Sequence, residues 1–158
     1  SGKSTLSRVL SSYFSCEILE LGNIARKICL KNNTDVLTFS DSLFKSPDPL
    51  TVVRTGLSTI KNHSIVIIVG PRHPSEINFL REKFSKSLIV GIQMDASIRF
   101  DRWKRLNGRH DIINDERDWK RREFLETRWG VDEIVFAADA RLTNLDFSIL
   151  EVFASEHR

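Results

Sequence analysis

Residues 1–5 read SGKST and match the end of a phosphate-binding loop, whose full pattern is G-x-x-x-x-G-K-[ST]. In such a loop, successive backbone N–H groups point at a polyphosphate. The lysine ammonium reaches the β- and γ-phosphates, and the hydroxyl of the next residue binds Mg²⁺. The pattern therefore predicts that ATP is bound by Ser1, Gly2, Lys3, Ser4 and Thr5, with Ser4 as the metal ligand.

The residues that follow this motif favour the phosphate loop over the alternative, a flexible terminal tag. In STLSRVLSSYF (residues 4–14), the apolar residues Leu6, Val9, Leu10 and Tyr13 fall on one face of a helix. A helix that begins here places the positive end of its dipole at the phosphates. A tag would not be followed by strands and helices that alternate in the phase this loop requires.

Strands and helices alternate along the rest of the chain. The clearest strand is SIVIIV (64–69), a continuous β-branched run that is typical of a strand buried on both faces. Further strands are expected in CEILEL (16–21), SLIVGIQM (87–94) and ARLTN (140–144). Helices are expected in the segments 22–30, 49–63, 75–84, 97–106, 116–129, 131–139 and 146–157. This alternation predicts an α/β domain with a parallel sheet that has helices on both faces.

Two features concern the organisation of the domain. Residues 32–49 are rich in loop and turn formers, so we expect a mobile insertion there. Ligands of open α/β sheets bind at the carboxyl ends of strands, so a strand should precede the loop. We therefore expect roughly ten further residues upstream, a strand of about 5–6 residues and the start of the loop. Residues 1–158 would then form a single domain.

The composition narrows the class of protein and its partners. Hydrophobic residues make up 41% of the chain and charged residues 28%, which predicts a soluble folded domain. The net charge of +3 fits a protein that binds phosphorylated small molecules, and it also fits a weak nucleic-acid binder. Two cysteines are too few for a disulfide framework, so we expect reduced thiols and a cytoplasmic location. No apolar run reaches the ~18 residues of a membrane span, so no membrane partner is expected.

Five blocks in sequence order resemble the P-loop nucleoside monophosphate kinases, in particular the adenylate kinase and dephospho-CoA kinase-like branch. They are SGKST (1–5), LGNIARKI (21–28), VGPRHPSE (69–76), MDASIRFDRWKRLNGRHD (94–111) and AADARLTNLDF (137–147). The resemblance implies a three-layer P-loop NTPase fold with a small helical lid at about residues 107–128. It also implies ATP and Mg²⁺ as cofactors.

The resemblance further implies roles for individual residues. The acceptor would be bound by Asn23, Arg26, Gly70 and Arg72, where Asn23 replaces the aspartate that is usual in the family. The transferring phosphoryl group would be stabilised by Lys3, by the lid arginines Arg105 and Arg109, and by Arg122. The donor nucleobase would lie near Asn144.

These inferences predict ATP-dependent phosphoryl transfer to a nucleoside monophosphate or a similar small acceptor that carries a phosphate. One departure matters, because Val69 stands where the family has an acidic residue that helps to place Mg²⁺. Asp95 or another acid could replace it, or the protein could be a catalytically weak or inactive regulatory protein that binds ATP. A nucleic-acid end kinase is a further alternative, which the basic lid region and its tryptophans support weakly. The sequence fixes neither the acceptor nor the oligomeric state.

Overall fold

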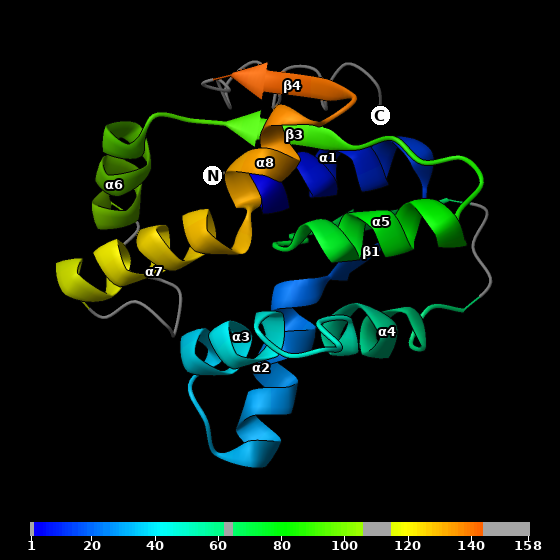
Figure 1. The fold of residues 1–158 in the computed structure, drawn as a ribbon. Helices are drawn as coiled ribbons and strands as arrows, with labels where there is room; N and C mark the ends of the chain where they lie inside the picture. The colour runs from blue at the N-terminus through cyan, green and yellow to red at the C-terminus, as the bar shows by residue number, and fades with distance from the viewer. Residues whose placement is uncertain (1, 62–64, 106–114, 144–158) are drawn as a thin grey trace.

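The computed structural model describes residues 2–61, 65–105 and 115–143, which form a mixed α/β structure that is mostly helical (Figure 1). The helices are α1 (Lys3–Phe14), α2 (Leu21–Asn32), α3 (Val36–Phe44), α4 (Thr51–Leu57), α5 (Pro74–Lys83), α6 (Ala96–Arg105), α7 (Glu116–Trp129) and α8 (Val131–Phe136). The strands are β1 (Glu17–Glu20), β2 (Val66–Val69), β3 (Val90–Gln93) and β4 (Ala140–Thr143). The helix expected at 146–157 lies outside the described residues.

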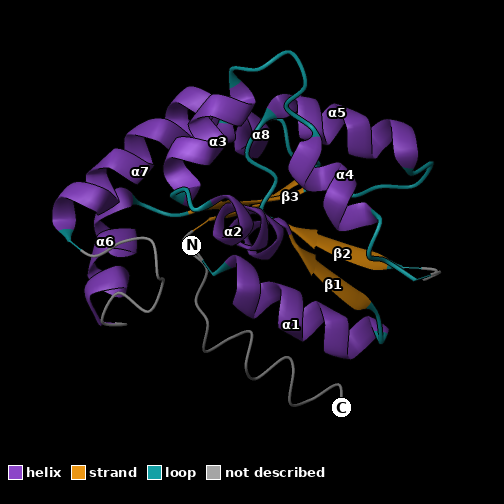
Figure 2. Ribbon diagram, turned by 90° about the horizontal axis from the view of Figure 1, so that it is seen from below, coloured by secondary structure: helices purple, strands orange, loops and turns teal. Residues whose placement is uncertain are grey.

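The strands pair in parallel, as the sequence predicts. β1 pairs with β2, with Glu17 opposite Val66, and β3 pairs with β4, with Val90 opposite Ala140. The expected single sheet is not observed, because the described strands form two separate sheets of two strands each. Helices cover both faces of the β1–β2 pair, with α1 on one side and α4 on the other (Figure 2).

The expectation that SIVIIV is buried on both faces is wrong. Every residue of β2 is only half-buried, and Ile65 just before it is 46% exposed. The physical reason is the narrow sheet: within the described residues β2 has a hydrogen-bonded neighbour along one edge only. In SLIVGIQM, the strand is limited to β3, where Gly91 alone is buried. A Cβ at Gly91 would lie 2.9 Å from the carbonyl oxygen of Val135, so α8 packs directly on the β3 backbone.

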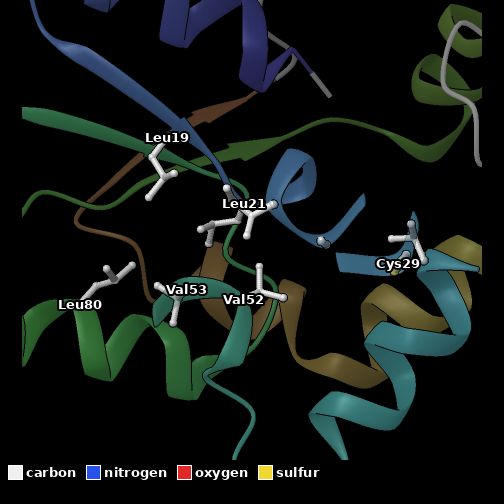
Figure 3. Packing of buried hydrophobic residues seen from close by; sticks show 9 residues of the cluster. Leu19, Leu21, Cys29, Val52, Val53 and Leu80 are labelled. Atoms are coloured by element: carbon white, nitrogen blue, oxygen red, sulfur yellow. The ribbon is translucent and has the colours of Figure 1, made fainter. Parts of the chain in front are cut away.

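The main core lies between β1, the start of α2, α4 and α5. Leu19, Leu21, Val52, Val53 and Leu80 meet there, and Val53 has no exposed surface (Figure 3). The sulfur of Cys29 also belongs to this cluster, and both cysteines are free thiols, as the sequence predicts.

The segment 32–49, which the sequence predicts to be a mobile insertion, contains helix α3. Asp35 caps this helix, since its carboxylate accepts hydrogen bonds from the backbone N–H groups of Leu37 at 3.0 Å and Thr38 at 3.2 Å. Leu37 is buried against Leu125 and Trp129 of α7. Contacts with a distant segment therefore stabilise a helix that turn-forming residues obscure in the sequence. No helix in the described ranges is long and apolar enough to cross a membrane.

Candidate anion-binding site

Helix α1 begins at the phosphate-loop motif. Gly2 precedes the helix with φ 77°, a left-handed conformation that glycine adopts without strain. Its carbonyl oxygen accepts the first helical hydrogen bonds, from the N–H groups of Thr5 at 3.1 Å and Leu6 at 3.0 Å. The first turn, with Lys3, Ser4 and Thr5, is partly buried and carries no acidic residue. An anion at this helix start would therefore meet no competing carboxylate from the helix itself.

Lys3 lies among charged side chains from three other segments. The pKa of the Lys3 ammonium is lowered to about 8, and burial is the largest cause. Glu126 opposes this shift, while the positive charges of Arg72, Arg122 and Arg99 add to it. Lys3 is thus part of a group in which positive charge exceeds negative charge.

Arg72 is held by the turn that joins β2 to α5. Gly70 takes a left-handed conformation with φ 83°, and the backbone N–H groups of Arg72 and His73 both donate to Oε2 of Glu76, at 2.8 and 3.2 Å. His73 and Glu76 form a capping box at the start of α5, with Pro74 as the first helical residue. Glu76 is only 2% exposed, and burial raises the pKa of its carboxyl group. This buried carboxylate fixes the backbone from which the Arg72 side chain projects.

Glu126 of α7 joins two of the cations. Its Oε1 accepts a hydrogen bond from Nε of Arg122 at 2.9 Å, and Nε of Arg72 lies 3.7 Å from the same oxygen. The three side chains are 18% to 21% exposed, so water screens them only partly. Burial alone would raise the pKa of Glu126, but the charges of Arg122, Arg72 and Lys3 outweigh it and lower the pKa to about 2.

Arg26 of α2 lies near this group, since its positive charge lowers the pKa of Arg72, although burial of Arg72 has the larger effect. The Arg26 guanidinium also donates a hydrogen bond to Oδ1 of Asn23. Asn23 in turn donates to Oε2 of Glu20 at 2.9 Å. Asn23 therefore orients Arg26 in the structure, and the pair that the resemblance assigns to the acceptor, Arg26 and Arg72, is close enough for their charges to interact.

Of the remaining predicted residues, the structure describes Arg105, which is not part of this group. Arg105 is exposed at the end of α6, where its charge acts on Arg102, and it is not among the largest influences on Lys3 or Arg72. Ser1, Arg109 and Asn144 lie outside the described residues. The structure thus brings together Lys3, Arg72 and Arg122, with Arg26 beside them.

Sequence reasoning missed three members of the site: Glu126, Glu76 and Arg99. Glu126 follows Arg122 by four residues on a predicted helix, which is a spacing typical of ion pairs. Glu76 stands three residues after the helix-capping position, where a glutamate completes a capping box. Arg99 donates to the carbonyl oxygen of Met94 at 3.1 Å and pairs with Glu123 of α7. No local pattern in the sequence marks Arg99.

Comparison with known proteins gives relatives but no activity. No family model matches the chain. The chain is 28% identical over 94 residues to a UPF0200 protein of Methanopyrus kandleri, which covers 58% of this chain and 47% of that protein. It is 26% identical over 137 residues to a UPF0200 protein of Thermococcus kodakarensis, with 80% and 74% covered. A UPF0200 protein of Pyrococcus horikoshii is 32% identical over 87 residues, with 54% and 46% covered.

The homologues are therefore archaeal UPF0200 proteins, and their names state no substrate or reaction. The chain spans about half the length of the Methanopyrus kandleri and Pyrococcus horikoshii relatives it matches.

Proposed function

We propose that this protein binds ATP at Lys3 and transfers its terminal phosphoryl group to a nucleoside monophosphate or a similar small acceptor that carries a phosphate. The observation that supports this most is the meeting of Lys3, Arg72 and Arg122, which come from three distant segments, at the start of α1. In this proposal the fold is a three-layer P-loop NTPase fold.

The proposed mechanism depends on positioning and charge, because phosphoryl transfer needs little covalent help from the protein. Lys3 and the backbone N–H groups at the start of α1 hold the β- and γ-phosphates of ATP. Arg26 and Arg72 hold the phosphate of the acceptor. Arg122 stabilises the negative charge on the transferring group, together with the predicted lid residues Arg105 and Arg109.

The described residues fit a polyphosphate. Lys3 has a pKa of about 8 and is therefore mostly protonated at pH 7, and the surrounding arginines leave the site with excess positive charge. Nε of Arg99, whose charge also acts on Lys3, is buried without a hydrogen-bond partner among the described residues. This N–H group could therefore donate to a ligand. These features favour an anionic ligand.

The fit to Mg²⁺ depends on Ser4. No group of three or more His, Cys, Asp or Glu side chains that could hold a metal occurs in the described ranges, and Val69 supplies no carboxylate at the end of β2. The Ser4 hydroxyl would hold Mg²⁺ with phosphate oxygens and water as the other ligands. The bound ion would neutralise charge on the β- and γ-phosphates.

Val69 favours one alternative, an ATP-binding regulatory protein with weak or no turnover. The other alternative, a nucleic-acid end kinase, gains no support from the tryptophans. Trp129 is 4% exposed, and its Nε1 donates to Asp41 at 3.1 Å. Trp103 and Trp119 both pack on Phe100, with ring centroids 5.6 and 4.9 Å from it. These three side chains anchor helices.

The test is a coupled assay for ADP release across a panel of nucleoside monophosphates, together with calorimetric measurement of ATP binding. Lys3→Ala should weaken ATP binding and lower turnover by roughly 10²-fold or more, as expected for loss of a preorganised charge contact. Lys31→Ala, which removes the same charge from an exposed position near the end of α2, is the control. Unchanged binding and turnover in Lys3→Ala would contradict the assignment. ATP binding without turnover on any acceptor would favour the regulatory protein.

A further inference from the structure

Three carboxylates lie close to the cations of the candidate site, and they differ in what holds them. Glu76 is buried and accepts two backbone N–H groups, so it belongs to the local fold of the turn after β2. Glu123 pairs with Arg99 between α7 and α6. Glu126 alone of the three contacts two cations from different segments, Arg122 on its own helix and Arg72 in the turn.

The contacts of Glu126 use a single carboxylate oxygen. Nε of Arg122 and Nε of Arg72 approach the same Oε1, at 2.9 and 3.7 Å, and the charge of Glu126 also acts on Lys3. An anionic oxygen that lies between two guanidinium groups and near an ammonium is also the environment that a phosphoryl oxygen would occupy. The carboxylate therefore occupies the same kind of position as the proposed ligand.

We propose that Glu126 is an internal counter-ion of the anion-binding site, which holds Arg72 and Arg122 in the ligand-free protein and gives way to a phosphoryl group when the substrate binds. The inference rests on the proposed function for the identity of the ligand. It assigns Glu126 a positioning role, because the residue acts through the two arginines.

The charges explain why such a counter-ion is needed. Without a ligand, Lys3, Arg72 and Arg122 would repel one another in a site that water screens only partly. Glu126 offsets this repulsion and keeps the arginine side chains in place. The same carboxylate then repels an incoming phosphate, so it weakens ligand binding while it stabilises the ligand-free protein. A carboxylate with a purely structural role would stabilise the ligand-free protein but would not weaken ligand binding.

Two variants at Glu126 test this. Glu126→Gln keeps the shape of the side chain and removes its charge, and Glu126→Asp keeps the charge but shortens the side chain by one methylene. Glu116→Gln is the matched control, because it removes the same charge from an exposed position at the start of the same helix. Pyrophosphate without Mg²⁺ is the probe, and its dissociation constant and its effect on the melting temperature are measured for each full-length variant.

Glu126→Gln should bind pyrophosphate roughly tenfold more tightly than the wild type, since one opposing charge has been removed from a partly buried site. Without pyrophosphate the variant should melt at a lower temperature, and pyrophosphate should raise its melting temperature more than that of the wild type. Glu126→Asp should show the same changes to a smaller extent, because its shorter side chain holds the carboxylate farther from Arg72 and Arg122. If Glu126→Gln does not fold, the shorter carboxylate still tests the proposal.

Affinity in Glu126→Gln that is equal to or weaker than in Glu116→Gln would overturn the inference. If Glu126→Gln fails to fold, an affinity of Glu126→Asp for pyrophosphate that is equal to or weaker than that of Glu116→Gln would overturn the inference. The proposed function is tested separately. Tighter pyrophosphate binding in Glu126→Gln, with no ADP release on any acceptor, would support the counter-ion role and contradict the kinase function. ADP release by the wild type, with no gain in pyrophosphate affinity in Glu126→Gln, would support the kinase function and contradict the counter-ion role.

Discussion

The buried carboxylate of Glu76 allows a stability prediction that follows directly from the structure. Glu76→Ala removes the one oxygen, Oε2, that accepts hydrogen bonds from the backbone N–H groups of Arg72 and His73. Leaving a buried donor unsatisfied costs about 1–3 kcal/mol. Two such donors would cost about 2–6 kcal/mol, and relaxation of the turn that admits water to one of them lowers this cost. We therefore expect Glu76→Ala to lower the free energy of unfolding by about 2–4 kcal/mol.

The matched variant Glu76→Gln should behave differently. Its side-chain carbonyl oxygen can accept both hydrogen bonds, and the burial that raises the pKa of the Glu76 carboxyl group shows that the negative charge itself is unfavourable there. We therefore expect Glu76→Gln to change the free energy of unfolding by less than about 1 kcal/mol. Glu82→Ala, at an exposed position of the same helix, should stay within about 0.5 kcal/mol of the wild type.

Thermal and urea denaturation of the wild type and the three variants give the measurement. For a domain of this size, a loss of 2–4 kcal/mol corresponds to a melting temperature that is lower by roughly 5–15 °C. The reasoning is refuted if Glu76→Gln is as damaging as Glu76→Ala. It is also refuted if Glu76→Ala is as stable as the Glu82→Ala control.

Further predictions concern the anion-binding site and the packing of α8. Arg72→Lys keeps the charge but loses the planar guanidinium that can donate two hydrogen bonds to one phosphate. It should raise the KM for the acceptor or lower turnover, with little change in ATP affinity. A fall in ATP affinity without any effect on the acceptor would contradict the assignment of Arg72 to the acceptor. Glu126 has a folded-state pKa of about 2, below its ordinary value of 4.5, so its ionised form contributes up to about 3 kcal/mol that is present above pH 4.5 and lost as the pH falls toward 2. Urea midpoints measured between pH 7 and pH 2 should therefore fall less steeply for Glu126→Gln, and equal slopes would show that the shift is absent. Gly91→Ala places a Cβ 2.9 Å from the carbonyl oxygen of Val135. It should therefore lower the free energy of unfolding by about 1–3 kcal/mol, as measured by urea denaturation. An unfolding free energy equal to that of the wild type would show that α8 can shift away from β3 without loss of stability.

Local elements are what the sequence by itself determined. Helix α1 starts at the motif because Gly2 can take a left-handed conformation and an amphipathic stretch follows it. The β-branched run of β2 and the short run of β4 form parallel strands as predicted. These features depend on residues that are neighbours in the chain, and such neighbours can be read directly from the sequence.

Only the tertiary structure decided which of these segments meet. Helix α3 was hidden among turn-forming residues because its stability depends on burial of Leu37 against Trp129, far away in the chain. The burial of β2 was overestimated because burial depends on the number of neighbouring strands, which a single segment does not encode.

The candidate site shows the same division. The phosphate-loop motif predicts Lys3 as a phosphate ligand, and the resemblance to nucleotide kinases assigns phosphate contacts to Arg72 and Arg122. For Glu126, the spacing of four residues from Arg122 indicated only the ion pair within one helix. Its contact with Arg72 and its effect on Lys3 come from the packing of α7 near the start of α1 and the turn after β2. A charge acts over a distance in space, so the balance of charge in the site was fixed only when the chain had folded.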